Sequence, residues 1–386
     1  MKLLHPLFLL PTAIRTALAY QTLSDSSLKN LPHPGSDFDI ETGNLLAPIL
    51  IPRVPGTENS TKVLHHFVDF FQTKLPDWDL TYQNSTSTTP TSQGKEIPFR
   101  NLIATRDPPW VKDHAGDVGR LVLVAHYDSK LTPEGFIGAI DSAAPCAMLM
   151  HAARSVDAAL TAKWASMAGD MEDNLDLEDH KGVQILFLDG EEAFASWTHT
   201  DSIYGARALA EEWETSFYPA TSTYKTPLHS MDLFVLLDLL GSKEPRVPSY
   251  FKTTHWAYQR MATVEKKLRK AGMFKSATEQ TTPFLHEAEK KETDMWAGGR
   301  VEDDHLPFLM RGVEILHIIP SPFPAGIWHT MDDDGEHLDM DTTEDWAVLV
   351  TAFVAEWMEL EGFLGESEKP TKGAGTNQTR RQRDEL

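Results

Sequence analysis

Cysteine is almost absent from this chain of 386 residues, because Cys146 is the only one. A single thiol excludes any intrachain disulfide, so the fold depends on its core rather than on covalent cross-links. Cys146 lies in an apolar segment, and no activating base neighbours it in the sequence. We therefore expect a buried structural thiol and not a nucleophile.

Basic residues and long apolar runs are also scarce. The chain has 35 Lys and Arg against 57 Asp and Glu, a formal net charge of -22, which argues against nucleic acid and anionic membranes as partners. No apolar stretch reaches the length that a membrane span requires. There is no internal repeat, and no long polar linker divides the sequence between its two ends. We therefore expect one domain over residues 20–364.

Both ends of the chain resemble targeting signals. A basic start, the apolar run Leu3–Leu10 and the small residues of Ala17–Ala19 predict a signal peptide over residues 1–19. The polar segment 365–386 is predicted to be a disordered tail. It ends in Arg383–Leu386, one residue from the Lys-Asp-Glu-Leu retention signal, so a retention receptor is an expected partner. The predicted location is the endoplasmic reticulum lumen, or outside the cell if no retention receptor recognises the tetrapeptide.

Three tripeptides of the Asn-x-Ser/Thr type begin at Asn59, Asn84 and Asn377. The first two lie in polar segments that should be exposed, and glycosylation there would agree with a secretory location. The Ser/Thr-rich stretch 84–94 is interpreted as an exposed loop. The acidic, weakly periodic stretch 164–181 is interpreted in the same way.

Strands and helices are predicted to alternate along the chain. Apolar runs that lack alternation are typical of strands buried on both faces, and they occur at 121–125, 184–188, 233–237 and 314–319, with a neighbouring or edge strand at 101–105. Helical periodicity occurs at 61–74, 142–159, 202–213, 255–271 and 342–363, and a short helix at 303–310 would have Asp303 at its capping position. This order predicts an α/β fold, a three-layer sandwich with a mixed, mostly parallel sheet between helices.

Acidic and histidine residues follow four of the predicted strands. His126 and Asp128 come after the first, Glu191 and Glu192 after the second, and Asp238 at the end of the third. Trp328 and His329 follow the fourth, after a Pro-rich loop, and Asp141 ends the segment that starts at Gly138. Ligands of open α/β sheets bind beyond the carboxyl ends of the strands, so these groups should meet at one edge. Asp141, Glu192 and His329 are the predicted ligands of a catalytic zinc with an open position.

Each of these residues also has an ordinary structural interpretation. Asp141 could cap the helix that follows it, and the pair Glu191–Glu192 could be a solvated first turn. His329 could be a loop histidine that bonds Asp332 or Asp333. The convergence of several such groups on one edge favours the functional interpretation over each ordinary one.

The chain resembles the glutaminyl-peptide cyclotransferases, on the zinc-aminopeptidase-like (M28-type) fold. The resemblance covers roughly residues 46–363 and is carried by nine ordered blocks: Pro52–Gly56, Ala125–Lys130, Gly138–Ala147, Phe187–Phe194, Asp201–Arg207, Leu236–Gly241, Asp303–Phe308, His317–Pro324 and Trp328–Asp333. It implies one zinc per chain on the three predicted ligands and Glu191 as general acid/base. It further implies a polar network of Asp238, Asp303 and His317, and pocket walls formed by Trp197, Phe323 and Trp328. By residue type alone, Trp197 would be a core aromatic and His317 a satisfied core histidine.

The implied activity converts the N-terminal Gln of a peptide or protein into pyroglutamate and releases ammonia. One departure stands out, because animal relatives carry a cysteine where this chain has Ala125 and pair it with the residue matching Cys146. The disulfide is lost here, which should affect stability rather than chemistry. Two alternatives stay open: a zinc aminopeptidase with a second metal at His126 and Asp238, and a non-catalytic lumenal peptide-binding domain.

Overall fold

A six-stranded mixed sheet forms the centre of the computed structural model, which describes residues 22–112, 114–167, 180–298 and 300–365. The strands are β1 (Asp79–Thr88), β2 (Glu96–Arg106), β3 (Gly119–His126), β4 (Lys181–Leu188), β5 (Met231–Leu237) and β6 (Ile315–Ile318). Their order is β1-β2-β4-β3-β5-β6, in which β2 runs against both of its neighbours and the remaining pairs are parallel. The predicted signal peptide and, from residue 366 on, the predicted tail lie outside the described residues.

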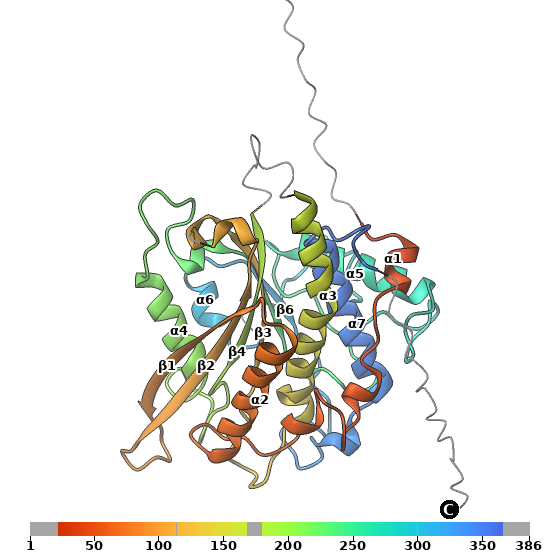
Figure 1. Ribbon diagram of the computed structural model, residues 1–386. Coiled ribbons are helices and arrows are strands. Elements are labelled where there is room, and N and C mark those ends of the chain that lie inside the picture. Colours follow the sequence, from red (N-terminus) through yellow and green to blue (C-terminus); the bar gives the residue numbers. More distant parts are fainter. Residues whose placement is uncertain (1–21, 113, 168–179, 299, 366–386) are drawn as a thin grey trace, which may run out of the picture.

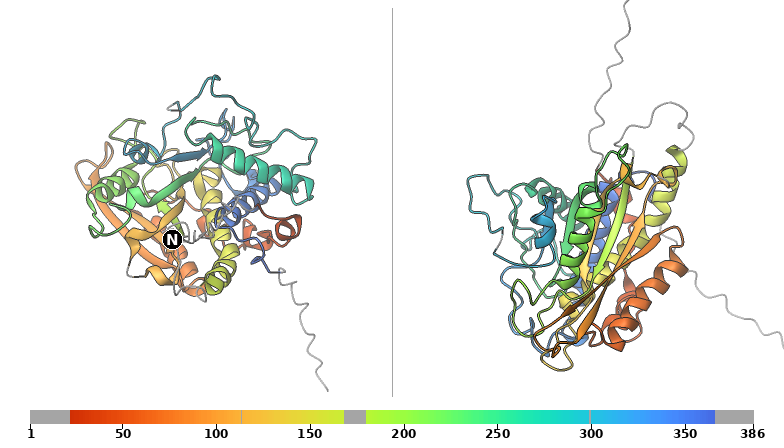
Figure 2. Two further views of the ribbon diagram at one scale, coloured as in Figure 1. Left: turned by 90° about the horizontal axis from the view of Figure 1, so that it is seen from above. Right: turned by 90° about the vertical axis from the view of Figure 1, so that its left-hand side faces the viewer.

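Helices cover both faces of this sheet (Figure 1). They are α1 (Asp25–Lys29), α2 (Glu58–Lys74), α3 (Ala144–Met167), α4 (Tyr204–Thr215), α5 (His255–Lys270), α6 (Leu306–Leu309) and α7 (Met340–Trp357). In the right-hand view of Figure 2 the sheet separates α4, in green, from α2, in orange-red. The predicted three-layer α/β sandwich is confirmed.

Apolar and polar residues do not alternate along the central strands, because these strands lie between two hydrophobic cores. In β3, Leu121 and Leu123 pack into the core that holds α2, α3, α5 and α7, while Val122 and Val124 pack into the core with α4 and α6. Successive side chains of a strand point to opposite faces, so a strand with two covered faces must be apolar throughout. Among the described residues, no helix combines the length and apolarity that a membrane crossing needs.

The interpretation of 84–94 as a loop was wrong for its first half. Residues 84–88 belong to β1, which pairs along its whole length with β2. The Thr residues there suit a strand, and a polar composition suits one that lies at the edge of the sheet. Only the remainder of that stretch forms the connection to β2.

Three other boundaries differ from those expected. The helix α3 continues through Met167, because Trp164 is buried beneath the Arg106 guanidinium, so the predicted loop 164–181 begins later and its part at 168–179 lies outside the described residues. The helix α6 has His305 and not Asp303 at its N-cap position. The helix α7 ends at Trp357, and the chain turns there so that Leu360 is buried.

Candidate active site

The loops that follow β3, β4, β5 and β6 bring their polar side chains to one edge of the sheet. One pocket of about 480 Å³ is lined by Asp141, Glu191, Glu192, Asp238 and His329 together with three aromatic residues. Glycine allows two of the turns that deliver these acids. Gly190 has φ +75° and packs against the Phe99 ring, and Gly138 has φ +66° and lies against the Asp141 carbonyl.

The three predicted metal ligands converge in this pocket. Oxygen atoms of Asp141 and Glu192 and a ring nitrogen of His329 all lie within 4.8 Å of one another. His329 Nε2 is 3.4 Å from Asp141 Oδ2 and 3.7 Å from Glu192 Oε1. His329 has φ +58°, a left-handed conformation that is uncommon outside glycine and that often occurs at functional sites.

The chemistry of this triad fits a bound cation. Glu192 Oε1 is buried and accepts no hydrogen bond from a described residue. Burial and the nearby charge of Asp141 raise the pKa of Glu192 well above its usual value, although the charge of Lys130 acts in the opposite direction. Burial also disfavours ionisation of Asp141, but hydrogen bonds from His126 and His329 outweigh it and lower its pKa. A divalent metal ion would add positive charge next to Glu192 Oε1, the oxygen that the Lys130 ammonium does not contact.

The ordinary interpretations of these residues do not hold in the structure. Asp141 has non-helical backbone angles, and α3 begins only at Ala144, so its carboxylate is free to face His126 and His329. Glu191 and Glu192 are 6% and 3% exposed, which excludes a solvated turn. His329 faces acids from other loops rather than its neighbours Asp332 and Asp333.

A second group of possible ligands shares Asp141. His126 Nε2 lies 3.0 Å from Asp141 Oδ1 and 3.5 Å from Asp238 Oδ1. These three atoms also meet the spacing for a metal site. Although burial opposes it, hydrogen bonds to Asp128, Asp141 and Asp238 raise the pKa of His126 well above its usual value.

Glu191 lies beside the triad and is held by its backbone. Asp128 Oδ1 and Oδ2 accept hydrogen bonds from the N–H groups of Glu191, at 3.0 Å, and Glu192, at 3.2 Å. Burial raises the pKa of Glu191 well above its usual value, and the charges of Glu192 and Asp303 act in the same direction. A carboxyl group with a raised pKa can both accept and return a proton near neutral pH.

Asp238 is fixed at the end of β5. Its Oδ1 accepts a hydrogen bond from the Leu239 N–H at 2.8 Å and a short one from the Ser142 hydroxyl. Burial, with the charge of Asp303, raises the pKa of Asp238. The side chain therefore enters the pocket in one orientation and can hold a proton there.

Three aromatic side chains, Trp197, Phe323 and Trp328, also line the pocket. The Trp328 ring stacks on His329 at 4.0 Å and meets Phe323 at 4.8 Å. Trp197 is 37% exposed and donates from Nε1 to Glu302 Oε2 at 2.8 Å. The structure thus places Trp197 at the pocket rather than in the core, against the interpretation by residue type.

Asp303 and His317 form a buried pair that does not line the pocket. His317 Nε2 lies 2.7 Å from Asp303 Oδ2, and both side chains are at most 2% exposed. Burial opposes ionisation of Asp303, but the hydrogen bond and charge of His317 outweigh it and lower its pKa. The pair can influence the pocket through its charge on Glu191 and Asp238, and not by direct contact.

Four residues that support the site were not assigned a role from the sequence. They are Arg53, Asp128, Lys130 and Asp333. The fully buried Arg53 donates to the carbonyls of Tyr127 and Gly138, and Asp333 accepts from the Ile140 N–H at 2.7 Å, so both order the loop that carries Asp141. Lys130 Nζ lies 3.0 Å from Glu192 Oε2. Asp128 and Lys130 follow β3 directly, and all four residues lie in blocks that carry the family resemblance, although Arg53 and Asp333 are far from Asp141 in the sequence.

Cys146 is buried and unpaired, as expected. Its thiol donates to the His126 carbonyl at 3.2 Å, and burial raises its pKa to about 12, so it is no nucleophile. Ala125, the position at which the family resemblance implies a partner cysteine, is fully buried in the same core. The Cys146 thiol contacts the carbonyl of His126, the residue next to Ala125, so a cysteine at position 125 would lie near it and a cross-link can be tested.

We expect Ala125→Cys to form a disulfide with Cys146 during oxidative folding. Closing a loop of about 20 residues should raise the free energy of unfolding by about 3 kcal/mol, because the cross-link restricts the unfolded chain. Thermal unfolding with and without a reductant measures this gain, and Ala125→Ser is the matched control. Two titratable thiols in the denatured, unreduced protein would contradict the expectation.

Comparisons with known proteins agree with this geometry. Residues 109–354 match the model of peptidase family M28. The chain is 37% identical over 342 residues to glutaminyl-peptide cyclotransferase from Bos taurus, covering 88% of this chain and 87% of the relative. The enzyme of the same name from Bothrops jararaca is also 37% identical, covering 82% and 80%. The crystal structure of Macrostomum lignano glutaminyl cyclase superposes with a TM-score of 0.71 at 30% identity, covering 90% of this chain and 97% of that one.

Proposed function

Because this chain belongs to the glutaminyl-peptide cyclotransferase group of peptidase family M28, we propose that it is an aminoacyltransferase that converts N-terminal Gln of peptides and proteins into pyroglutamate. The observation that carries this proposal is the meeting of Asp141, Glu192 and His329 beside the buried Glu191, in one pocket with aromatic walls. Ammonia is the second product. The proposed cofactor is one zinc ion per chain.

Asp141, Glu192 and His329 would hold the zinc, since they offer the oxygen and nitrogen atoms that a catalytic zinc site with an open position uses. When bound there, zinc supplies Lewis-acid polarisation of the substrate's γ-carbonyl group. Lys130 pairs with the second oxygen of Glu192 and so leaves Oε1 directed at the site. Asp141 is shared between His126 and His329, which holds its carboxylate in place.

Glu191 is the proposed general acid/base. The substrate's α-amine attacks its own γ-carbonyl carbon, and a bond from that nitrogen to the carbon closes the ring. Glu191 takes the proton that the amine loses and gives it to the departing amide nitrogen, which leaves as ammonia when its bond to the carbon breaks. Asp238 would accept a hydrogen bond from that amide nitrogen and orient it.

Trp197, Phe323 and Trp328 would bind the apolar part of the Gln side chain. Holding the amine near the carbonyl makes the reaction effectively unimolecular, and positioning of this kind supplies much of the rate. Asp303 and His317 are proposed to act as a charged pair behind the pocket that adjusts the protonation of Glu191 and Asp238. They are positioning residues, since neither lines the pocket.

Incubation of the purified protein with a Gln-initiated peptide, followed by mass spectrometry, tests this function. Cyclisation removes the mass of one ammonia molecule and leaves the peptide chain intact. A matched peptide with N-terminal pyroglutamate should not change. Loss of the whole first residue from the Gln peptide would contradict the proposal.

The second candidate is a zinc aminopeptidase with two metals. The group formed by His126, Asp141 and Asp238 favours it, because a second ion there would share Asp141 with the first and could activate a water. Metal stoichiometry separates the two functions: one zinc per chain supports the cyclotransferase, and two support the peptidase.

The location of the enzyme is part of the same proposal. The features that support it are the predicted signal peptide over residues 1–19 and the retention-like Arg383–Leu386, which a retention receptor would bind. Residues 20–364 are proposed to form a single catalytic domain, since one sheet connects their elements. The segment 365–386 is proposed to be a tail accessible to the receptor.

A further inference from the structure

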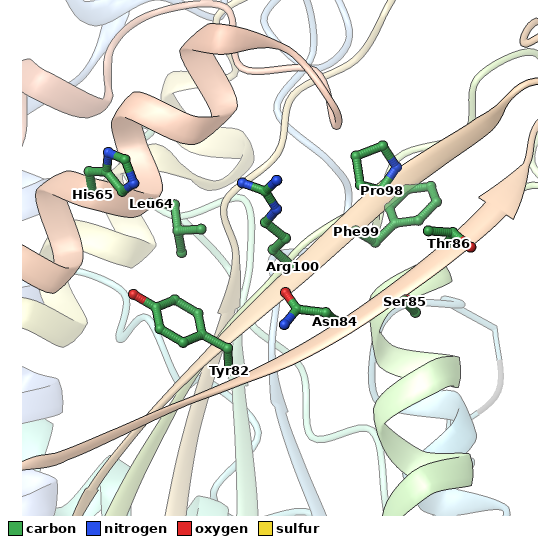
Figure 3. Close-up of a pocket in the computed structure, with 9 residues that line it drawn as sticks. All are labelled: Leu64, His65, Tyr82, Asn84, Ser85, Thr86, Pro98, Phe99 and Arg100. Atoms are coloured by element: carbon green, nitrogen blue, oxygen red, sulfur yellow. The ribbon is translucent and has the colours of Figure 1, made fainter.

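A second hollow lies away from the active site, between the outer strands of the sheet and α2. It has a volume of about 660 Å³, and Figure 3 shows the side chains around it. Tyr82 and Asn84 come from β1, Pro98 and Arg100 from β2, and α2 closes the far side with residues that include Leu64. We call this hollow the β1–α2 groove.

The side chain of Asn84, a predicted glycosylation acceptor, points into the β1–α2 groove. Its neighbour Gln83 is buried on the opposite face of the sheet, where its Oε1 accepts from Asn101 Nδ2 at 2.7 Å beneath α4. Side chains alternate along a strand, so Tyr82, Asn84 and Thr86 share the face toward α2. Arg100 stands directly opposite Asn84 in the register of β1 and β2.

The groove combines an apolar surface with polar groups. Tyr82 is 47% exposed and presents its ring along the strand from Asn84, as Figure 3 shows. The exposed Arg100 guanidinium offers several N–H donors beside it. An N-acetylglucosamine has a face of C–H groups that suits an aromatic ring and an edge of hydroxyl and acetamide groups that suits Arg100.

We propose that Asn84 carries an N-linked glycan whose first sugar lies in the β1–α2 groove against Tyr82. The proposal rests on passage of the chain through the secretory pathway and is independent of the catalytic function. The glycan comes from a lipid-diphosphate-linked oligosaccharide. A bond forms between Asn84 Nδ2 and the sugar C1 carbon, the bond from that carbon to the lipid diphosphate breaks, and the proton lost by the amide leaves with the diphosphate.

The glycan has a structural consequence for the sheet. β1 is an edge strand, and its outer N–H and C=O groups could pair with another chain. A sugar seated on the face of β1 and extending past that edge would hinder such pairing. Asn59, the other acceptor within the described residues, lies on a helix and not on the edge strand. It is in the first turn of α2, where the side chains of Asn59 and Thr61 are about 200° apart around the helix axis.

The test uses the full chain expressed through the secretory pathway of a eukaryotic host and purified from its secretory compartments or the medium, with Asn59→Gln and Asn377→Gln so that only Asn84 can be modified. Peptide mapping by mass spectrometry should find a glycan on Asn84. After an endoglycosidase trims it to one sugar, the protein should unfold about 1–3 °C above the Asn84→Gln form. In Tyr82→Ala this difference should vanish, whereas in Tyr82→Phe, which keeps the ring, it should persist.

Tyr82→Thr provides a second ring-free variant that favours a strand, should Tyr82→Ala fold poorly. Thr86→Ser keeps the acceptor sequence and should remain glycosylated, while Thr86→Ala should lose the glycan. An unmodified Asn84 in protein purified from the secretory compartments or the medium would overturn the proposed modification. A stability difference of equal size with and without the Tyr82 ring would overturn the proposed seating of the sugar.

Discussion

Replacing Glu191 with glutamine is expected to lower kcat for a Gln-initiated peptide by about 10²–10⁴-fold, the usual contribution of a general acid/base. Glutamine has nearly the same size and keeps the backbone bond to Asp128 Oδ1, so the loop should not move. It cannot carry a proton between the amine and the leaving nitrogen. Because the group acts in the transition state, kcat and kcat/KM should fall together.

The zinc content separates this effect from damage to the site. Glu191→Gln should still bind one zinc per chain, measured by elemental analysis, because Glu191 is outside the triad whose ligand atoms converge. The matched control is Glu134→Gln, an exposed glutamate outside the pocket, which should retain wild-type turnover. Near-normal turnover in Glu191→Gln with zinc bound would remove Glu191 from the mechanism.

The second large effect is expected from removing any one metal ligand. Asp141→Ala, Glu192→Ala and His329→Ala should each weaken zinc binding by more than about 10²-fold, since the loss of an outer partner of a ligand already costs 10–100-fold. The variants should lose their zinc on dialysis, and their activity with it. Chelation of the wild-type protein should abolish activity, and added zinc should restore it.

The control for this series is His337→Ala. His337 is an exposed histidine that pairs with Asp334 outside the pocket, so its removal should leave the zinc content unchanged. Any ligand variant that keeps full zinc occupancy after dialysis would be removed from the ligand set. Two zinc ions in the wild-type protein would instead favour the aminopeptidase.

The architecture could be predicted from the sequence because strands that are buried on both faces of the sheet consist mainly of apolar residues. The strands β3, β4 and β5 are apolar at every position that faces either core, so they could be located from Val, Ile and Leu runs alone. β1 could not be located in this way. Its residues are mostly exposed, and only pairing with β2 makes them a strand.

The sequence also determined which acids and histidines would meet. Parallel strands end at the same edge, so Glu191, Glu192 and His329 could be assigned to one site from their places after strands, and Asp141 joined them as a further possible metal ligand. The motif resemblance assigned their roles, which the experiments above test.

Only the tertiary structure decided how that site is supported and what surrounds it. Arg53 and Asp333 contact the loop of Asp141 from distant parts of the chain, and Asp303 and His317 lie behind the pocket rather than in it. Contacts between residues far apart in sequence leave no local pattern, because each depends on how the loops pack. The surroundings of Asn84 were also decided by the tertiary structure. Its glycosylation tripeptide can be recognised in the sequence, but the groove beside it forms only where β1, β2 and α2 come together.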